Sequence, residues 1–167
     1  MEKKELKLGH TMRDWTSGFT GLSVCEVEHY SGLIRFGIQP PSKEADKIAD
    51  ALEVDAHTLE WVDDGRVADV LPPTGTPDFV LGNQVEDVVS GFVGIAMIKV
   101  THLNGCVYYT VVGKHDSKAV IKENRQSIEE ARLKRWGDGI VGKMDKGTPD
   151  PKTNKVPGGL STRMERR

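Results

Sequence analysis

The sequence predicts an all-β protein made of two tandem copies of one small barrel, followed by a short helix and an extended C-terminal arm. The main observation is a repeat: residues 87–112 align with residues 14–39 without a gap, at an offset of 73 positions. Unrelated segments of this length share roughly one or two identities, so we interpret the match as an internal duplication. The identical positions are Asp14/Asp87, Ser17/Ser90, Gly18/Gly91, Phe19/Phe92, Gly21/Gly94, Val27/Val100, His29/His102 and Gly32/Gly105.

Length and composition agree with this class. The chain has 167 residues, which suffices for one ordinary domain or two small ones. A hydrophobic content of 37%, with 18 Gly and 8 Pro, indicates short elements separated by many turns. Units of this size have modest cores, so we expect them to pack against each other or against a partner.

In the first copy, turn residues separate short apolar stretches. Ser17-Gly18 marks one turn, and residues 30–32 are typical of a hairpin turn that contains glycine. Pro40-Pro41 ends the strand that follows, because proline lacks the N–H that a sheet needs. We predict a lead-in strand or arm within residues 1–12, and strands over residues 22–28, 33–38, 52–54 and 58–62.

The second copy follows the same course, with strands predicted over residues 94–101 and 106–112. The segment after them has two interpretations. Residues 119–130 loosely echo the last two strands of the first copy. Alternatively, Ser127 and Glu130 form a capping box that opens a short helix over residues 128–136, and the predicted fold includes this helix.

Five short strands per copy, joined by tight glycine turns, are the pattern of a small SH3-like barrel. We expect Phe19 and Phe92 to pack at the barrel mouths and Trp61 to lie in the core. Asp14 and Asp87 are expected to accept hydrogen bonds from the turns that follow them. The predicted divisions are residues 1–66 for the first barrel with its lead-in, 67–80 for a linker, 81–136 for the second barrel with the helix, and 137–167 for an extended basic arm.

Charge is divided unevenly along the chain. Residues 1–113 carry 9 Lys/Arg and 17 Asp/Glu, whereas residues 114–167 carry 14 Lys/Arg and 8 Asp/Glu. A basic tail on an acidic body favours an electrostatic partner for the tail, although a solvated tail fits the charge equally well. The composition of residues 137–167 cannot bury enough apolar surface to fold alone, so we expect this arm to lie along a neighbouring molecule.

No motif for catalysis emerges. His29 and His102 are candidates for a base or a ligand, but a half-exposed cross-strand histidine is the favoured interpretation. A triad of Asp14, Ser17 and His29 is disfavoured, because duplicated units rarely keep two active sites. The segments SGFTG and SGFVG lack the G-K-[ST] ending of a phosphate loop. We therefore predict no enzyme activity and no catalytic residues.

Cofactors, metals and membranes are also not predicted. Cys25 and Cys106 do not occupy equivalent repeat positions or show metal-ligand spacing, and buried free thiols are expected. The start of the chain lacks the apolar core of a signal peptide, and the longest apolar run, residues 91–98, is too short to cross a bilayer. Nucleic acid is disfavoured, because the barrels carry the acidic excess and have few aromatic residues for base stacking.

The repeated pattern D-x-x-[ST]-G-F-x-G, followed in the first copy by a glycine turn, an aromatic strand and L-E-W-V-D-D, resembles small uncharacterised proteins of tailed bacteriophages and prophages. This resemblance implies a virion structural protein, first of all a capsid decoration (cement) protein. Its expected partners are other virion proteins, the major capsid protein above all, with many copies in one assembly. The expected location is the capsid surface, after assembly in the host cytoplasm. The alternatives are a tail or head–tail connector component and an SH3-like nucleic-acid-binding protein.

An interface is the only kind of site that we predict. Trp15 and Trp136 are large aromatic residues that suit interface anchors, and the arm supplies the other candidates. The predicted interface residues are Trp15, Trp136, Ile140, Val141, Met144, Val156, Leu160, Arg163, Arg166 and Arg167.

Overall fold

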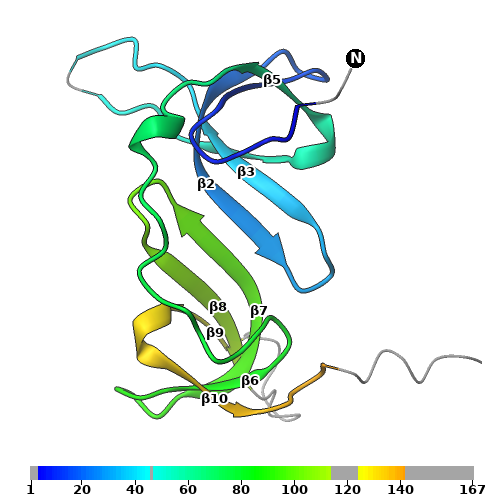
Figure 1. Cartoon of the computed structure of the whole chain (residues 1–167), viewed down its shortest axis with the longest axis vertical. Coiled ribbons are helices and arrows are strands. Elements are labelled where there is room, and N and C mark those ends of the chain that lie inside the picture. Colours follow the sequence, from blue (N-terminus) through cyan, green and yellow to red (C-terminus); the bar gives the residue numbers. More distant parts are fainter. Residues whose placement is uncertain (1–3, 46, 114–123, 142–167) are drawn as a thin grey trace, which may run out of the picture.

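The computed structural model describes residues 4–45, 47–113 and 124–141, and these residues form an antiparallel β-protein (Figure 1). Ten strands and three short 3-10 helices are present in the described ranges, with no α-helix. The predicted all-β class is therefore confirmed. Two strand-rich halves lie one above the other in Figure 1, and hydrogen-bonded strands connect them.

The first half is a five-stranded antiparallel arrangement in the order β5-β1-β2-β3-β4. The short 3-10 helix η1 connects β4 to β5, and a second 3-10 helix, η2, follows β5. The bounds are β1 (Thr11–Asp14), β2 (Thr20–His29), β3 (Ile34–Gln39), β4 (Leu52–Asp55), η1 (Ala56–Thr58), β5 (Leu59–Asp63) and η2 (Val67–Asp69). The predicted lead-in strand begins only at Thr11, because residues 4–10 form turns and irregular backbone.

The second half has the strand order β10-β6-β7-β8-β9, with the same pairing scheme as the first half. Each of its strands begins 73 or 74 residues after its counterpart. The bounds are β6 (Gln84–Asp87), β7 (Val93–His102), β8 (Val107–Gly113), β9 (Arg125–Glu129), η3 (Glu130–Arg132) and β10 (Leu133–Gly137).

The helix predicted over residues 128–136 is wrong. This segment is the end of β9, the three-residue helix η3, and most of β10. Pairing of β9 with β8 and of β10 with β6 satisfies its backbone and buries Ile128 and Leu133, so tertiary contacts override the local helix signal. The capping box does not form, because Glu130 instead accepts a hydrogen bond from the Tyr109 hydroxyl at 3.3 Å.

Each half has its own core. Met12, Phe36, Ile38, Val54 and Leu59 form the first cluster, and Phe79, Val85, Ala96, Val107, Tyr109, Val111, Ile128 and Leu133 form the second. Phe19 and Phe92 pack against the first and second cluster respectively, as predicted. The prediction for Trp61 is wrong: its side chain lies on β5 outside the core and is 38% exposed, with the Lys4 ammonium 3.9 Å from the ring centroid.

The two halves join edge to edge through β2 and β7. These strands pair antiparallel from Cys25↔His102 to His29↔Ile98, while their opposite edges pair with β3 and β8. A four-stranded sheet therefore runs through the middle of the molecule (Figure 1). The free edge that each hairpin would present alone is covered by the other hairpin, which removes an aggregation-prone edge from both halves.

Candidate functional site

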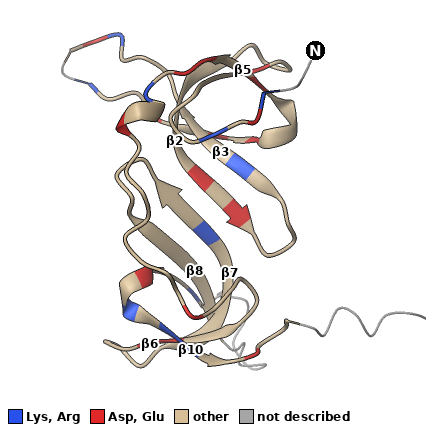
Figure 2. Cartoon of the chain, viewed as in Figure 1, with Lys and Arg blue, Asp and Glu red and all other residues tan. Residues whose placement is uncertain are grey.

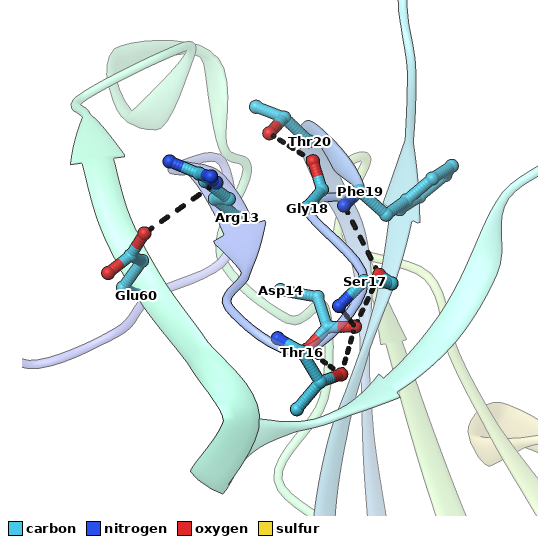
Figure 3. A network of polar contacts seen from close by, with 8 residues as sticks. All are labelled: Arg13, Asp14, Thr16, Ser17, Gly18, Phe19, Thr20 and Glu60. Atoms are coloured by element: carbon cyan, nitrogen blue, oxygen red, sulfur yellow. Dashed lines mark hydrogen bonds and ion pairs between the residues drawn. The ribbon is translucent and has the colours of Figure 1, made fainter.

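The repeated D-x-x-S-G segment forms a tight turn after β1, held by the carboxylate of Asp14 (Figure 3). The backbone N–H groups of Thr16 and Ser17 each donate to this carboxylate at 3.2 Å, and the Ser17 hydroxyl donates at 2.5 Å. Gly18 follows with φ of 74°, a left-handed conformation that favours glycine. The predicted role of Asp14 as an acceptor for the following turn is confirmed.

The Asp87 turn after β6 has the same geometry and one additional partner. Val89 and Ser90 donate their backbone N–H groups to Asp87, and the Ser90 hydroxyl donates at 2.5 Å. Arg132, from η3, places Nε 3.0 Å from Oδ1 and Nη2 2.5 Å from Oδ2. This bidentate ion pair ties the turn to η3, directly before β10, and the first half has Thr58 at the corresponding position.

These contacts supply hydrogen-bond donors to both oxygens of each carboxylate and lower the pKa of both aspartates. Hydrogen bonds from Ser17 and Thr16 hold the pKa of Asp14 well below its usual range. Hydrogen bonds from Arg132 and Ser90 do the same to the pKa of Asp87. A carboxylate saturated with donors is a weak base, so the arrangement stabilises a turn and is poorly suited to proton transfer.

The disfavoured triad is not assembled. Asp14 and Ser17 are hydrogen-bonded to each other, but His29 is the last residue of the ten-residue strand β2, which begins at Thr20. A strand of ten residues spans roughly 30 Å, so the imidazole lies far from the Asp14 turn.

His29 and His102 are half-buried cross-strand residues at the ends of β2 and β7, as the favoured interpretation expected. His29 Nε2 is buried without a hydrogen-bond partner in the described part of the chain, beside a pocket of about 370 Å³ between the halves. The His102 ring meets the Tyr108 ring edge-on, with 5.9 Å between centroids. No group of three His, Cys, Asp or Glu side chains suited to a metal ion occurs among the described residues.

The two cysteines are free thiols in the part of the chain that the structure covers. Both are half-buried, and burial raises the pKa of the Cys25 thiol. A thiol with a raised pKa is a poor nucleophile at neutral pH. The Cys25 sulfur lies against Gly37, so its place in the structure is that of a packing residue.

The predicted interface residues are placed as follows. Trp15 follows β1 and is 62% exposed, and Trp136 on β10 is 57% exposed. Val141 is also exposed, whereas Ile140 is half-buried and donates its N–H to Gly82 O at 2.9 Å. Met144, Val156, Leu160, Arg163, Arg166 and Arg167 lie outside the described residues.

Sequence reasoning missed that the equivalence also extends to the residues before Asp14 and Asp87. His10 and Asn83 occupy the same turn: Lys7 N–H donates to His10 Nδ1 at 3.0 Å, and Val80 N–H donates to Asn83 Oδ1 at 2.9 Å. The short motifs LGH (residues 8–10) and LGN (residues 81–83), at the same offset of 73, carried this signal.

The exposed strand β5, and β10 apart from Trp136, were also missed as candidate surfaces. Apart from Leu59 and Leu133, their residues are exposed or half-buried. The charged residues on β5 are Glu60 and Asp63, and those on β10 are Lys134 and Arg135. Glu60 and Lys134 are each the second residue of their strand. The segments LEWVD and LKRWG carried this signal, because each has charged residues at two of its five positions, acidic in the first and basic in the second.

No helix among the described residues is long and apolar enough to cross a membrane. Comparison of the chain with protein-family models, with curated proteins and with solved structures found no match in any of the three. The fold and the site geometry therefore define an antiparallel all-β protein whose conspicuous features are surfaces and turns.

Proposed function

We propose that this chain is a non-enzymatic structural protein of a tailed-phage virion, built from two tandem SH3-like barrels, and that it decorates the capsid. Support for the barrel assignment comes from the strand order β5-β1-β2-β3-β4 and from the 3-10 helix between β4 and β5. The second half repeats both features with β6–β10 and η3. Small barrels of this kind serve as compact binding modules on many unrelated proteins.

The observation that carries the proposal is the placement of two large aromatic side chains outside the cores. Trp15 is 62% exposed beside a turn that five hydrogen bonds to the Asp14 carboxylate hold in place, and Trp136 is 57% exposed on β10. Exposed tryptophans on a rigid backbone lose little conformational entropy on binding and are frequent energetic anchors of protein interfaces. A decoration protein needs such anchors, because it attaches to an assembled shell as a preformed body.

The test is the copy number of the chain in purified particles, measured by mass spectrometry against isotope-labelled peptides. A decoration protein is expected in many copies, in a constant ratio to the major capsid protein. Six or twelve copies would replace decoration by a head–tail connector role. Absence from particles would refute the virion assignment altogether.

A matched set of variants tests the anchors. Trp15→Ser and Trp136→Ser should reduce incorporation into particles while leaving the fold intact, because neither side chain belongs to a core cluster. Ile48→Ser is the control, since Ile48 is 86% exposed but lies in the loop before β4, outside the predicted interface. Equal incorporation of all three variants would contradict the role of the tryptophans.

A further inference from the structure

Within the described residues the strands β5 and β10 each have one unpaired edge, as do β4 and β9. β5 pairs with β1 and β10 pairs with β6, and they are the two ends of the main strand order. We call residues 60–63 the β5 surface and residues 134–137 the β10 surface. Figure 1 shows them at opposite ends of the molecule, which leaves both accessible at the same time.

Both surfaces present apolar side chains outward. Each strand contains a bulge, at Val62 in β5 and at Trp136 in β10, where the register with the partner strand shifts by one residue. Val62 is 42% exposed and Trp136 is 57% exposed. A bulge re-aims a side chain and interrupts the ladder, so contact through side chains is favoured over continuous strand addition.

The two surfaces carry opposite charge. Glu60 and Asp63 belong to the β5 surface, whereas Lys134 and Arg135 belong to the β10 surface (Figure 2). Contact between two β5 surfaces or two β10 surfaces would bring like charges together. Contact between a β5 surface and a β10 surface pairs opposite charges around the apolar side chains, which is the arrangement that specifies one partner and excludes others.

Charge over the described residues differs between the halves in the same direction. Residues 7–45 and 47–67 carry 6 Lys/Arg and 10 Asp/Glu, a balance of −4, whereas residues 80–113 and 124–141 carry 5 of each. The first half is therefore the more acidic one, which favours contact between unlike halves of two molecules over contact between two first halves.

We propose that copies of this chain associate head-to-tail, with the β5 surface of one copy against the β10 surface of the next. Such a contact is heterologous, so it generates a ring if the rotation closes and an open row of copies if it does not. The proposal stands independently of the virion assignment, because it concerns only the purified chain.

The charged side chains also have partners within their own half. Arg13 Nε lies 3.8 Å from Glu60 Oε1, and Arg135 Nη2 lies 2.5 Å from Asp138 Oδ1. These four side chains are about half exposed or more, and exposed ion pairs contribute roughly 0–1 kcal/mol, so replacing such a pair by a contact in a second copy costs little. Lys134 Nζ lies 2.9 Å from the buried Glu86 Oε2, so that pair is costlier to exchange and Arg135 is the more available cation.

The experiment is a charge exchange followed by sedimentation velocity of the full chain at rising protein concentration. One variant, Glu60→Lys with Asp63→Lys, makes both surfaces basic, and the other, Lys134→Glu with Arg135→Glu, makes both acidic. Each variant alone should self-associate at least about tenfold more weakly than the native chain. An equimolar mixture of the two should associate again, because a basic and an acidic surface then face each other.

Controls of equal charge change lie in the loop before β4: Glu44→Lys with Asp50→Lys, and Lys43→Glu with Lys47→Glu. They should associate like the native chain. A native chain that stays monomeric at every concentration would overturn the proposal, as would a mixture that fails to associate. If circular dichroism shows that a charge variant does not fold, the variant Trp136→Ser replaces it in the test. Unchanged self-association of folded Trp136→Ser would also overturn the head-to-tail proposal.

Discussion

Val27 and Val100 lie directly opposite each other at the centre of the pairing between β2 and β7, and they are aligned in the sequence at the offset of 73 positions. Backbone bonds repeat on either side of them: Tyr30 N–H donates to Met97 O at 2.8 Å, and Leu103 N–H donates to Val24 O at 3.1 Å. The junction therefore has approximate two-fold symmetry about the two valines. Each half uses the equivalent edge of its long strand, β2 or β7, to meet the other half.

We expect the valine pair to couple the stability of the two halves. Val27 is 3% exposed, so Val27→Ala should lower the free energy of unfolding by about 2 kcal/mol. Val100→Ala should cost less, because Val100 is only half-buried. The double variant should depart from additivity by about 0.5–1 kcal/mol, as expected for a cross-strand pair. Urea unfolding of the four proteins measures this, and strict additivity would show that the valines do not interact.

Two repeated glycines should respond differently to alanine. Gly18 has φ of 74° and no atom within 4 Å of an added Cβ, so Gly18→Ala should cost about 1–2 kcal/mol from backbone strain alone. At Gly21, an added Cβ would lie 2.4 Å from Gln39 O, a clash that requires strands β2 and β3 to separate. Gly21→Ala should cost about 3 kcal/mol or more, measured by urea unfolding. Equal costs at both positions would contradict this distinction.

His10 should make stability depend on pH between neutral and mildly acidic conditions. Burial lowers its pKa from 6.5, with Lys4 and Lys7 acting in the same direction and Asp64 and Asp63 opposing them. The neutral imidazole is favoured in the folded chain, so this contribution is complete above pH 6.5 and is lost as the pH falls through the lowered pKa. Protonation also removes the Nδ1 acceptor that Lys7 uses.

The second half supplies the control for His10, because Asn83 makes the same turn without titrating. His10→Asn should flatten the pH dependence of stability in this range while preserving the acceptor for Lys7 N–H. Urea unfolding at several pH values measures the slope. An unchanged slope in His10→Asn would show that another group titrates.

The two turn aspartates should dominate acid sensitivity at lower pH. The pKa values of Asp14 and Asp87 are lowered from 3.8, so their stabilisation is complete above that value and disappears as the pH falls through the lowered pKa values. Asp14→Asn and Asp87→Asn should each reduce the loss of stability between neutral pH and acid. Asp87→Asn should be the more harmful at neutral pH, because it leaves Arg132 without its ion pair; the reverse order would contradict the role of that pair.

Truncation separates the second half from the segment that follows it. Removing residues 142–167 should leave a stable fold and abolish attachment to the assembly, if these residues make the contacts that we propose for the arm. Removing residues 137–167 should also lower the melting temperature, because it takes away the Ile140 N–H bond to Gly82 O and the Asp138 O acceptor for Asn83. Full attachment by the shorter deletion would refute a binding role for the arm.

Much of the fold was predictable because its signals are local. The turns at Gly32 and Gly105 were expected from the sequence and have φ of 83° and 79°. Strand β2 was predicted within two residues at its start and one at its end. The Asp14 turn followed from an aspartate that precedes Ser-Gly, since the carboxylate accepts from N–H groups two and three residues later.

The segment from Ile128 to Trp136 was mispredicted because its local and tertiary preferences conflict. Leu, Arg, Lys and Ala residues favour a helix, but Ile128 and Leu133 are needed in the core on two different strands. Trp61 was assigned to the core by residue type, whereas the strand that carries it places only Leu59 inward. In both cases the deciding contacts come from β6, β8 and β1, which are distant in sequence.

The sequence by itself determined the β class, the repeat and the turns, because hydrophobic spacing and glycine positions act within a few residues. Only the tertiary structure decided that β2 meets β7, that residues 133–137 form a strand, and that the β5 and β10 surfaces face outward with opposite charge. The reason is physical: backbone pairing between strands 73 positions apart leaves no mark on either strand alone. Local rules explain why the two halves share one strand order, and the difference between their surfaces is visible only once the strands are placed.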